Sequence, residues 1–224
     1  MDFDSLRDAS LKPYRFSKIE IRDLLISILV LTLAFMLMFR NTDFITSYFE
    51  YRLGSLWPLG LFILMAAVVI MSFVFHELGH KFTAQKFGLW SEYRMFPMGL
   101  LFALVMAPLG FLFAAPGVTY IQGYVNQEQD GKISLAGPMV NIVLSVIGLA
   151  GCMAFNGNAV IILFYLMFIL NASLALFNLL PIGILDGAKI LRWDSGIWLL
   201  CIIIAGALFL SRMTGMLPDF YYTL

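Results

Sequence analysis

Residues 57–80 read WPLGLFILMAAVVIMSFVFHELGH and join a long uncharged run to two histidines and a glutamate. The pair Trp57-Pro58 suits the start of a helix at a membrane interface. The run continues without a charge to Phe75 and meets His76 with no loop in between. This stretch therefore predicts a membrane-spanning helix that ends in a polar motif.

The composition of the whole chain agrees with a membrane environment. Of its 224 residues, 61% are hydrophobic and 12% are charged, against ~45–50% and ~25% in soluble domains. The net charge is zero, so there is no electrostatic reason to expect a nucleic-acid partner. Cys152 and Cys201 lie in separate apolar runs and predict neither a disulfide framework nor a zinc knuckle. The 21 Phe and 13 Met residues are interpreted as packing and lipid-facing side chains, and no organic cofactor is expected.

Apolar runs divide the chain into five spans, at 24–39, 57–75, 134–155, 159–180 and 195–211. The turn residues Asn156-Gly157-Asn158 separate the third span from the fourth. A sixth apolar stretch, 97–117, contains prolines and glycines and either crosses the membrane or enters and leaves on one side. We therefore expect an all-α polytopic membrane protein with about five to six transmembrane helices. It would have a cytoplasmic tail at 1–23, which forms an interfacial helix or a disordered arm, a single membrane domain at 24–212 and a short tail at 213–224.

The positions of Lys and Arg favour a re-entrant stretch after the motif. If the N-terminus is cytoplasmic and 97–131 turns back, eleven of the 14 Lys and Arg residues lie in the cytoplasm and three outside. If 97–131 crosses, the division falls to nine and five. Cytoplasmic segments of membrane proteins are enriched in Lys and Arg. We therefore expect a re-entrant loop and a cytoplasmic N-terminus, with the protein in the cell membrane.

The motif His76-Glu77-Leu78-Gly79-His80 has the spacing HExxH. On a helix, residues four apart share one face, so both imidazoles can bind one Zn²⁺ ion. Glu77 then lies beside the metal, where it can take a proton from water. A chance match is the alternative. Against it, these are the only two histidines in the chain, and an ionisable glutamate near membrane depth is usually functional.

A catalytic zinc ion requires a third protein ligand and an open position. No histidine remains, and Asp186 is the single carboxylate of the charge-poor region 133–188. Pro181 and Gly183 should break the preceding span and leave Asp186 facing a cavity. An ordinary Asp-Gly turn at a helix end is the alternative. We predict that His76, His80 and Asp186 are the metal ligands and that Glu77 is the catalytic base.

Three motifs in this order resemble the site-2 protease family of intramembrane zinc metalloproteases, peptidase family M50. They are HExxH in one span, Ala136-Gly137-Pro138-Met139-Val140-Asn141, and Asn178-x-x-Pro181 followed by Asp186-Gly187. The resemblance covers roughly residues 57–192. It implies a zinc held by two His and one Asp, a Glu as base and a membrane-embedded β-hairpin after the HExxH helix. It also implies regulated cleavage of transmembrane proteins.

Two asparagines in apolar spans are further candidates. Asn141 and Asn178 are predicted to bind the substrate backbone or the developing oxyanion. Hydrogen bonding between helices is the alternative for both. Residues 116–125 are rich in β-branched and aromatic side chains, so an exposed strand edge there could hold an unwound substrate.

Three other functions fit parts of this pattern. A prenyl-protein endopeptidase would use a downstream Glu as third ligand, where this chain offers Asp186. A zinc or proton transporter would need the ligands but no base. A protease-derived protein without activity would be expected to lack part of the set of His76, Glu77, His80 and Asp186, which is complete here.

Overall fold

The computed structural model describes residues 15–40, 42–109, 116–155 and 160–211. The predicted turn at 156–158, most of the predicted tail 1–23, the predicted tail 213–224 and the middle of the stretch 97–117 lie outside these residues. The fold is mostly helical with one small sheet. Its elements are α2 (Lys18–Phe39), α3 (Asp43–Leu53), α4 (Trp57–Val69), α5 (Phe75–Lys86), β1 (Trp90–Met95), α6 (Pro97–Met106), β2 (Gly117–Gln122), α7 (Gln127–Ala154), α8 (Val160–Asn178), α9 (Asp186–Trp193) and α10 (Ser195–Ser211).

Four helical stretches of the described chain are long and apolar enough to cross a membrane: Lys18–Phe39, Ile45–Lys86, Gln127–Ala154 and Val160–Asn178. Helix α10 coincides with the predicted last span, but at 17 residues it is shorter than these four. The α6 segment, Pro97–Leu109, is a second shorter apolar helix. The prediction of a mostly helical protein with several membrane-length helices is therefore confirmed.

The first helix begins at Lys18, before the predicted span 24–39, and Asp43–Leu53 form helix α3 between the first two predicted spans. Ser17 caps the start of α2, because its hydroxyl accepts the Glu20 N–H at 3.1 Å. Glu20 and Asp23, which read as part of a polar tail, are buried and hydrogen-bonded inside the fold. The apolar run 24–39 does not mark the start of this helix, because these charged residues have partners far along the chain.

Helix α2 shows how polar and apolar side chains are distributed in this fold. Leu25, Leu29 and Leu33 follow one another at four-residue spacing and are exposed. Ser27 and Thr32, by contrast, are completely buried. An apolar stripe facing outward and polar groups facing inward suit a helix whose surroundings are lipid.

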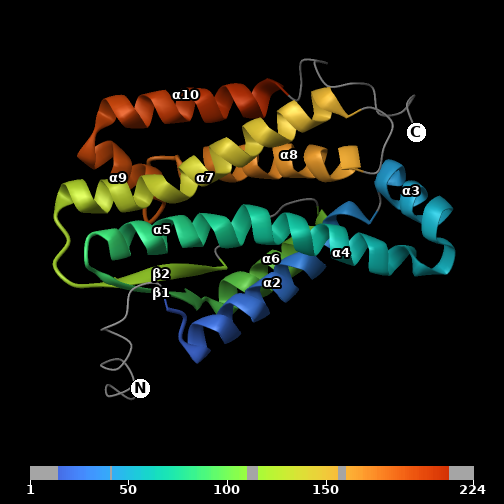
Figure 1. Cartoon of the computed structure of the whole chain (residues 1–224), viewed down its shortest axis with the longest axis horizontal. Coiled ribbons are helices and arrows are strands. Elements are labelled where there is room, and N and C mark those ends of the chain that lie inside the picture. The colour runs from blue at the N-terminus through green and yellow to red at the C-terminus, as the bar shows by residue number, and fades with distance from the viewer. Residues whose placement is uncertain (1–14, 41, 110–115, 156–159, 212–224) are drawn as a thin grey trace.

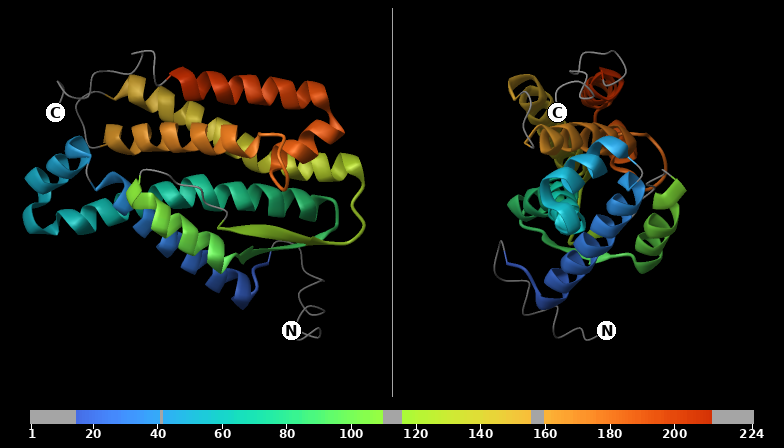
Figure 2. Two further views of the ribbon diagram at one scale, coloured as in Figure 1. Left: turned by 180° about the vertical axis from the view of Figure 1, so that it is seen from behind. Right: turned by 90° about the vertical axis from the view of Figure 1, so that its right-hand side faces the viewer.

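The helices form layers on both sides of α5 (Figures 1 and 2). Helix α7 packs against α5 on one side and α8 on the other, and α10 lies outermost beyond α8. The sheet lies against the opposite side of α5, together with α2 and α6. The HExxH helix is thus central and is covered from both sides.

Helices α4 and α5 are joined by a π-helical turn, Ile70–Val74, in which the Phe75 N–H bonds to the Ile70 carbonyl. Such turns often occur at functional sites. Here the turn ends two residues before His76, and the carbonyl of Ser72 within it accepts a hydrogen bond from another helix, described below.

Strands β1 and β2 pair antiparallel, with Tyr93 opposite Thr119 and Met95 opposite Gly117. The expected sheet after the HExxH helix is therefore present, but it is not a tight hairpin. Residues 96–116, including α6, leave β1 and return to β2 at the same end of the sheet.

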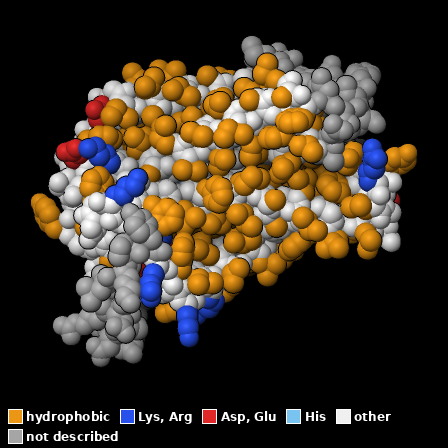
Figure 3. Space-filling view, in the orientation of Figure 1, with side chains coloured by type: hydrophobic (Ala, Val, Ile, Leu, Met, Phe, Trp, Pro, Cys, Tyr) orange, Lys and Arg blue, Asp and Glu red, His pale blue; other side chains and the backbone are white. Residues whose placement is uncertain are grey.

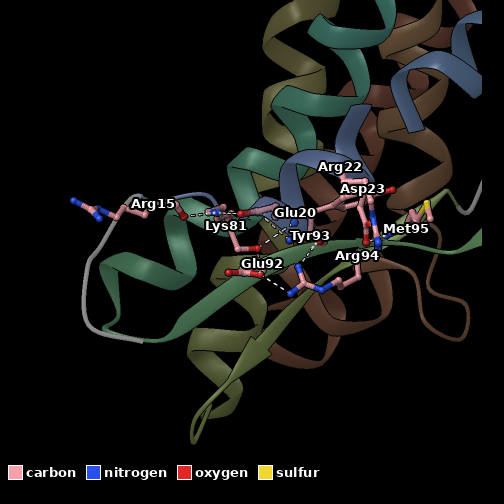
Figure 4. Close-up of polar contacts among 10 residues, drawn as sticks. Arg15, Glu20, Arg22, Asp23, Lys81, Glu92, Tyr93, Arg94 and Met95 are labelled. Atoms are coloured by element: carbon pink, nitrogen blue, oxygen red, sulfur yellow. Dashed lines mark hydrogen bonds and ion pairs between the residues drawn. The ribbon is translucent and has the colours of Figure 1, made fainter. Parts of the chain in front are cut away.

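The first turn of α2 covers the other edge of β1 (Figure 4). Glu20 accepts the Tyr93 N–H at 3.0 Å, and Asp23 accepts the Met95 N–H at 3.3 Å. Lys81 of α5 donates to Glu20, and both side chains are buried. This junction fixes α2, α5 and the sheet to one another.

Candidate metal centre

His76 and His80 lie one turn apart on the same face of α5, and both are buried. Their rings stand edge to face with centroids 4.6 Å apart. The two Nε2 atoms are 3.0 Å from each other. The i, i+4 spacing therefore brings two imidazole nitrogens to one point inside the protein.

Asp186 reaches the same point from the first residue of α9. Its Oδ2 atom lies 3.5 Å from His76 Nε2 and 3.3 Å from His80 Nε2. The chain arrives there by folding back against the end of α8, with Gly183 at φ +55°. A Cβ on Gly187 would come within 2.1 Å of the Leu179 carbonyl oxygen. The Asp-Gly pair is therefore required by a close backbone approach that brings the carboxylate to the histidines.

The outer nitrogens of both histidines are held by hydrogen bonds. His76 Nδ1 lies 2.6 Å from the Asn141 side-chain oxygen, and His80 Nδ1 lies 2.8 Å from the Ile133 carbonyl. Both partners are placed as acceptors, so each Nδ1 carries a proton. In the neutral ring the Nε2 atom then presents a lone pair. Both lone pairs converge with the Asp186 carboxylate, an arrangement that suits a cation.

The three donor atoms fit a zinc ion. Tetrahedral ligands at ~2.0–2.1 Å from zinc lie roughly 3.3 Å from one another, and the three observed separations run from 3.0 to 3.5 Å. No other group of three or more His, Cys, Asp or Glu side chains in the described parts of the chain brings its ligand atoms together in this way. The residue types and the distances between their ligand atoms thus match the three protein ligands of a catalytic zinc site.

Gly137 of α7 forms the wall beside the histidines. A Cβ on this residue would lie 2.4 Å from His80 Nε2 and 2.7 Å from His76 Cε1. Gly79 on α5 makes a similar approach, since its Cβ would lie 3.0 Å from the Ala136 carbonyl oxygen. Small residues on both helices let α7 pack directly over the site.

Glu77 is buried next to His76, and its carboxylate meets the sheet. The Thr119 hydroxyl on β2 donates to Glu77 Oε2 at 2.9 Å. Glu77 Oε1 has no hydrogen-bond partner among the residues that the structure describes. One oxygen of the carboxylate is therefore held while the other is available.

Asp186 lies outside the long apolar helices, and its carboxyl group is acidic. Burial alone would raise its pKa, but the adjacent imidazoles of His80 and His76 outweigh burial and hold the pKa well below its usual range. The group is therefore a carboxylate at neutral pH, the form that binds a metal.

The two predicted substrate contacts occupy different places. Asn141 is completely buried, and its amide donates to the Ser72 carbonyl at 2.9 Å and to Asn171 Oδ1 at 2.7 Å. Its oxygen faces His76, so its polar atoms are engaged inside the protein. Asn178 is half-buried and donates to the Leu174 carbonyl of its own helix at 3.0 Å.

Two contacts of the site were missed from sequence. Thr119 lies 42 positions after Glu77, and nothing marks it among the other residues of its strand. Ser72 stands four positions before His76 on the same helix face, a spacing that could have indicated it. Its hydroxyl accepts from Asn171 at 2.8 Å.

Comparison with known proteins places the chain among metalloproteases. The model of peptidase family M50 matches residues 152–193, the segment that contains Asn178 and Asp186. "Putative zinc metalloprotease MJ0611" of Methanocaldococcus jannaschii is 36% identical over 188 residues, which is 83% of this chain and 90% of that protein. No solved structure matches significantly.

Two further relatives match shorter parts. "Putative zinc metalloprotease Rip2" of Mycolicibacterium smegmatis is 35% identical over 147 residues, 57% of this chain and 56% of that protein. "Zinc metalloprotease MJ0392" of M. jannaschii is 32% identical over 136 residues, 59% of this chain and 33% of that protein. The chain therefore spans about half and a third of these two relatives, and nearly all of the first.

Proposed function

This chain belongs to peptidase family M50, the site-2 protease family of zinc metalloproteases, and on that premise we propose that it hydrolyses peptide bonds of transmembrane proteins within the membrane. The observation that carries the proposal is the convergence of His76, His80 and Asp186 beside Glu77, at the buried end of a membrane-length helix. Such cleavage would belong to regulated intramembrane proteolysis.

We assign the zinc ligands to His76 Nε2, His80 Nε2 and Asp186 Oδ2, which are the atoms that converge. Asn141 and the Ile133 carbonyl fix the orientation of the two rings. When bound, zinc supplies a Lewis acid that polarises the scissile carbonyl and makes water acidic enough to ionise near neutral pH. In this assignment Asn141 is a positioning residue for His76 rather than a substrate contact.

Glu77 is the base in this proposal. Its free oxygen takes a proton from the attacking water while the remaining hydroxide forms the new bond to the carbonyl carbon. The same carboxyl group then gives the proton to the leaving amine nitrogen as the peptide C–N bond breaks. The products are a carboxylic acid and an amine, so atoms and protons balance without a further co-reactant.

The proposed membrane setting is supported by the surface of the molecule. Hydrophobic side chains cover the middle of the face in Figure 3, while charged side chains gather toward its ends and its lower left edge. We further propose that the single membrane domain, 24–212, lies in the cell membrane with a cytoplasmic N-terminus. The pairing of Met95 with Gly117 supports a re-entrant path for 96–116, because the segment departs and returns at one place.

A transmembrane substrate has its backbone groups paired in a helix and must unwind before a carbonyl reaches the site. Asn178 is our candidate for a substrate contact, because it stands on the half-buried end of α8 before Asp186. The lipid bilayer is the other partner of the chain, as the exposed leucines of α2 support.

The replacement Glu77→Gln tests this proposal. Gln has nearly the shape of Glu but cannot accept the water proton at neutral pH. Since general acid–base help contributes ~10²–10⁴-fold, we expect cleavage of a model transmembrane substrate in liposomes to fall by about that factor or more. Zinc content, measured on the same samples, should stay at the wild-type level.

Asp186→Ala is the matched variant, expected to lose both zinc and cleavage. Cleavage by Glu77→Gln at nearly the wild-type rate would refute the role of the base. A zinc transporter is the competing function, and it needs ligands but no base. Zinc flux that survives Glu77→Gln, together with no cleavage by the wild-type protein, would favour the transporter.

A further inference from the structure

The Thr119 hydroxyl is the hydrogen-bond donor that the described structure places on the Glu77 side chain, at 2.9 Å from Oε2. We propose that Thr119 is a positioning residue for the reaction, which holds the Glu77 carboxylate so that Oε1 faces the water. The inference rests on the proposed function, since it assumes that Glu77 is the base. It assigns the β-sheet a part in catalysis in addition to any contact with substrate.

The direction of this hydrogen bond follows from the two groups. An ionised carboxylate only accepts, so the threonine hydroxyl must donate its single proton to it. The Glu77 backbone carbonyl is the other acceptor near this hydroxyl, but at 3.5 Å it is much farther away. The hydroxyl proton is therefore committed to Oε2. A glutamate side chain has several rotatable bonds, and the hydrogen bond from Thr119 fixes the position of its carboxylate relative to the sheet.

Thr119 is itself held firmly. It is buried on the inward face of β2, opposite Tyr93 of β1. Figure 4 shows Glu20 between the Tyr93 backbone and Lys81. Lys81 directly follows His80 on α5, so β1 is tied back to the helix that carries Glu77, and β2 with Thr119 is held there through its pairing with β1.

The hydrogen bonds of Glu20 therefore fix the distance between the sheet and α5. A threonine on a separately anchored strand can orient the glutamate with little motion of its own. A carboxylate that is free to rotate would spend less time in the orientation needed for proton transfer. Loss of the hydroxyl should therefore lower the rate of the chemical step, with little effect on substrate binding.

Two substitutions at Thr119 separate the hydroxyl from the shape of the side chain. Thr119→Val keeps the β-branched shape that suits a strand but removes the donor. Thr119→Ser keeps the donor. Thr32→Val is the control, because Thr32 is completely buried and its hydroxyl has no hydrogen-bond partner within the described residues. It makes the same chemical change away from the site.

The experiment measures kcat and KM for a transmembrane substrate, with zinc content and melting temperature on the same preparations. We expect Thr119→Val to lower kcat by about 10- to 100-fold, part of the ~10²–10⁴-fold that a base supplies. KM, zinc content and melting temperature should stay near wild type. Thr119→Ser should recover most of kcat, and Thr32→Val should not change it. In a Glu77→Gln background, Thr119→Val should have no further effect.

Several results would overturn the inference. Unchanged kcat in Thr119→Val would do so, and so would a rise in KM alone, since that would make Thr119 a substrate contact. An equal loss in the Glu77→Gln background, or a loss that follows zinc content or melting temperature, would assign Thr119 a purely structural role. Each of these leaves the proposed function standing if Glu77→Gln itself is inactive, whereas an active Glu77→Gln enzyme would fail the proposed function first.

Discussion

At the scale of single residues, the partners of the two histidines decide what the site can bind. His76 and His80 each use Nδ1 for a hydrogen bond, to Asn141 and to the Ile133 carbonyl. This leaves both Nε2 atoms to face Asp186. Partners of this kind orient metal-binding histidines and raise their basicity. The Asn141 side chain is thus expected to matter for metal affinity although it does not touch the metal position.

Removal of the Asn141 side chain should weaken zinc binding. In Asn141→Ala the His76 Nδ1–H and the Ser72 carbonyl lose their partners, and metal affinity should fall ~10–100-fold. Asn171→Ala is the control, because Asn171 bonds to Asn141 and Ser72 but not to His76. It should lower zinc affinity much less. Competition with a chromogenic chelator measures both, and equal losses in the two variants would contradict a direct role of Asn141 on His76.

The site residues that are charged or belong to a motif could be identified from the sequence, but the roles of the uncharged residues could not be assigned. His76, Glu77, His80 and Asp186 stand out because charges are rare in the apolar runs. Asn141 has the same appearance in sequence whether it contacts a substrate or a histidine, and only the packing of α7 on α5 places it. Thr119 gave no signal at all, since its partner Glu77 lies on another element.

At the scale of elements, the helix interfaces depend on small residues. Gly137 lets α7 pack over the histidines, and Gly148 and Gly151 let the same helix pack on α8 near Phe164. The positions of the long helices could be read from apolar runs, because period and length carry that information. The start of α2 could not, because Glu20 and Asp23 are buried by contacts with β1 that sequence does not show.

Adding a methyl group at Gly137 should damage the site. The new Cβ would lie 2.4 Å from His80 Nε2, so α7 or the histidine must move, at a cost of ~1–3 kcal/mol for overpacking. Gly137→Ala should therefore lose zinc and melt at a lower temperature. Gly206→Ala on α10 is the control, because its Cβ would meet nothing within 4 Å. It should keep zinc and be neutral or slightly stabilising. Normal zinc content in Gly137→Ala would mean that α7 lies farther from α5 than described.

At the scale of the whole molecule, the polar groups that matter for the site gather toward one end of the helix layers. The end of α5, the start of α7 and helix α9 lie at the same end in Figures 1 and 2, away from α3. Two separate apolar clusters stabilise the described helices: one joins α2, α4, α6 and α8, and the other joins α7, α8, α9 and α10. The charge distribution in the sequence had suggested that polar groups gather at one end, because a re-entrant 97–131 places eleven Lys and Arg residues on one side of the membrane. The path of 96–116 itself could not be read from composition, since an apolar stretch with prolines suits either a span or a loop.

Cysteine labelling tests this arrangement in the membrane. The two native cysteines, Cys152 and Cys201, are buried, so a background with both replaced by Ala should still fold. Single cysteines then replace the exposed residues Lys86, Glu128 and Ser55.

If 96–116 is re-entrant, Lys86→Cys and Glu128→Cys lie on the same side of the membrane. Lys86 precedes the sheet and Glu128 follows it, at the end of the molecule where α5 stops and α7 starts. A membrane-impermeant thiol reagent should then modify these two in inverted vesicles only. Ser55→Cys, at the α3 end, should react in intact cells only, because α4 and α5 cross between it and Lys86. Reaction of Glu128→Cys from the same side as Ser55→Cys would show that 96–116 crosses the bilayer, and the proposed topology would then be wrong.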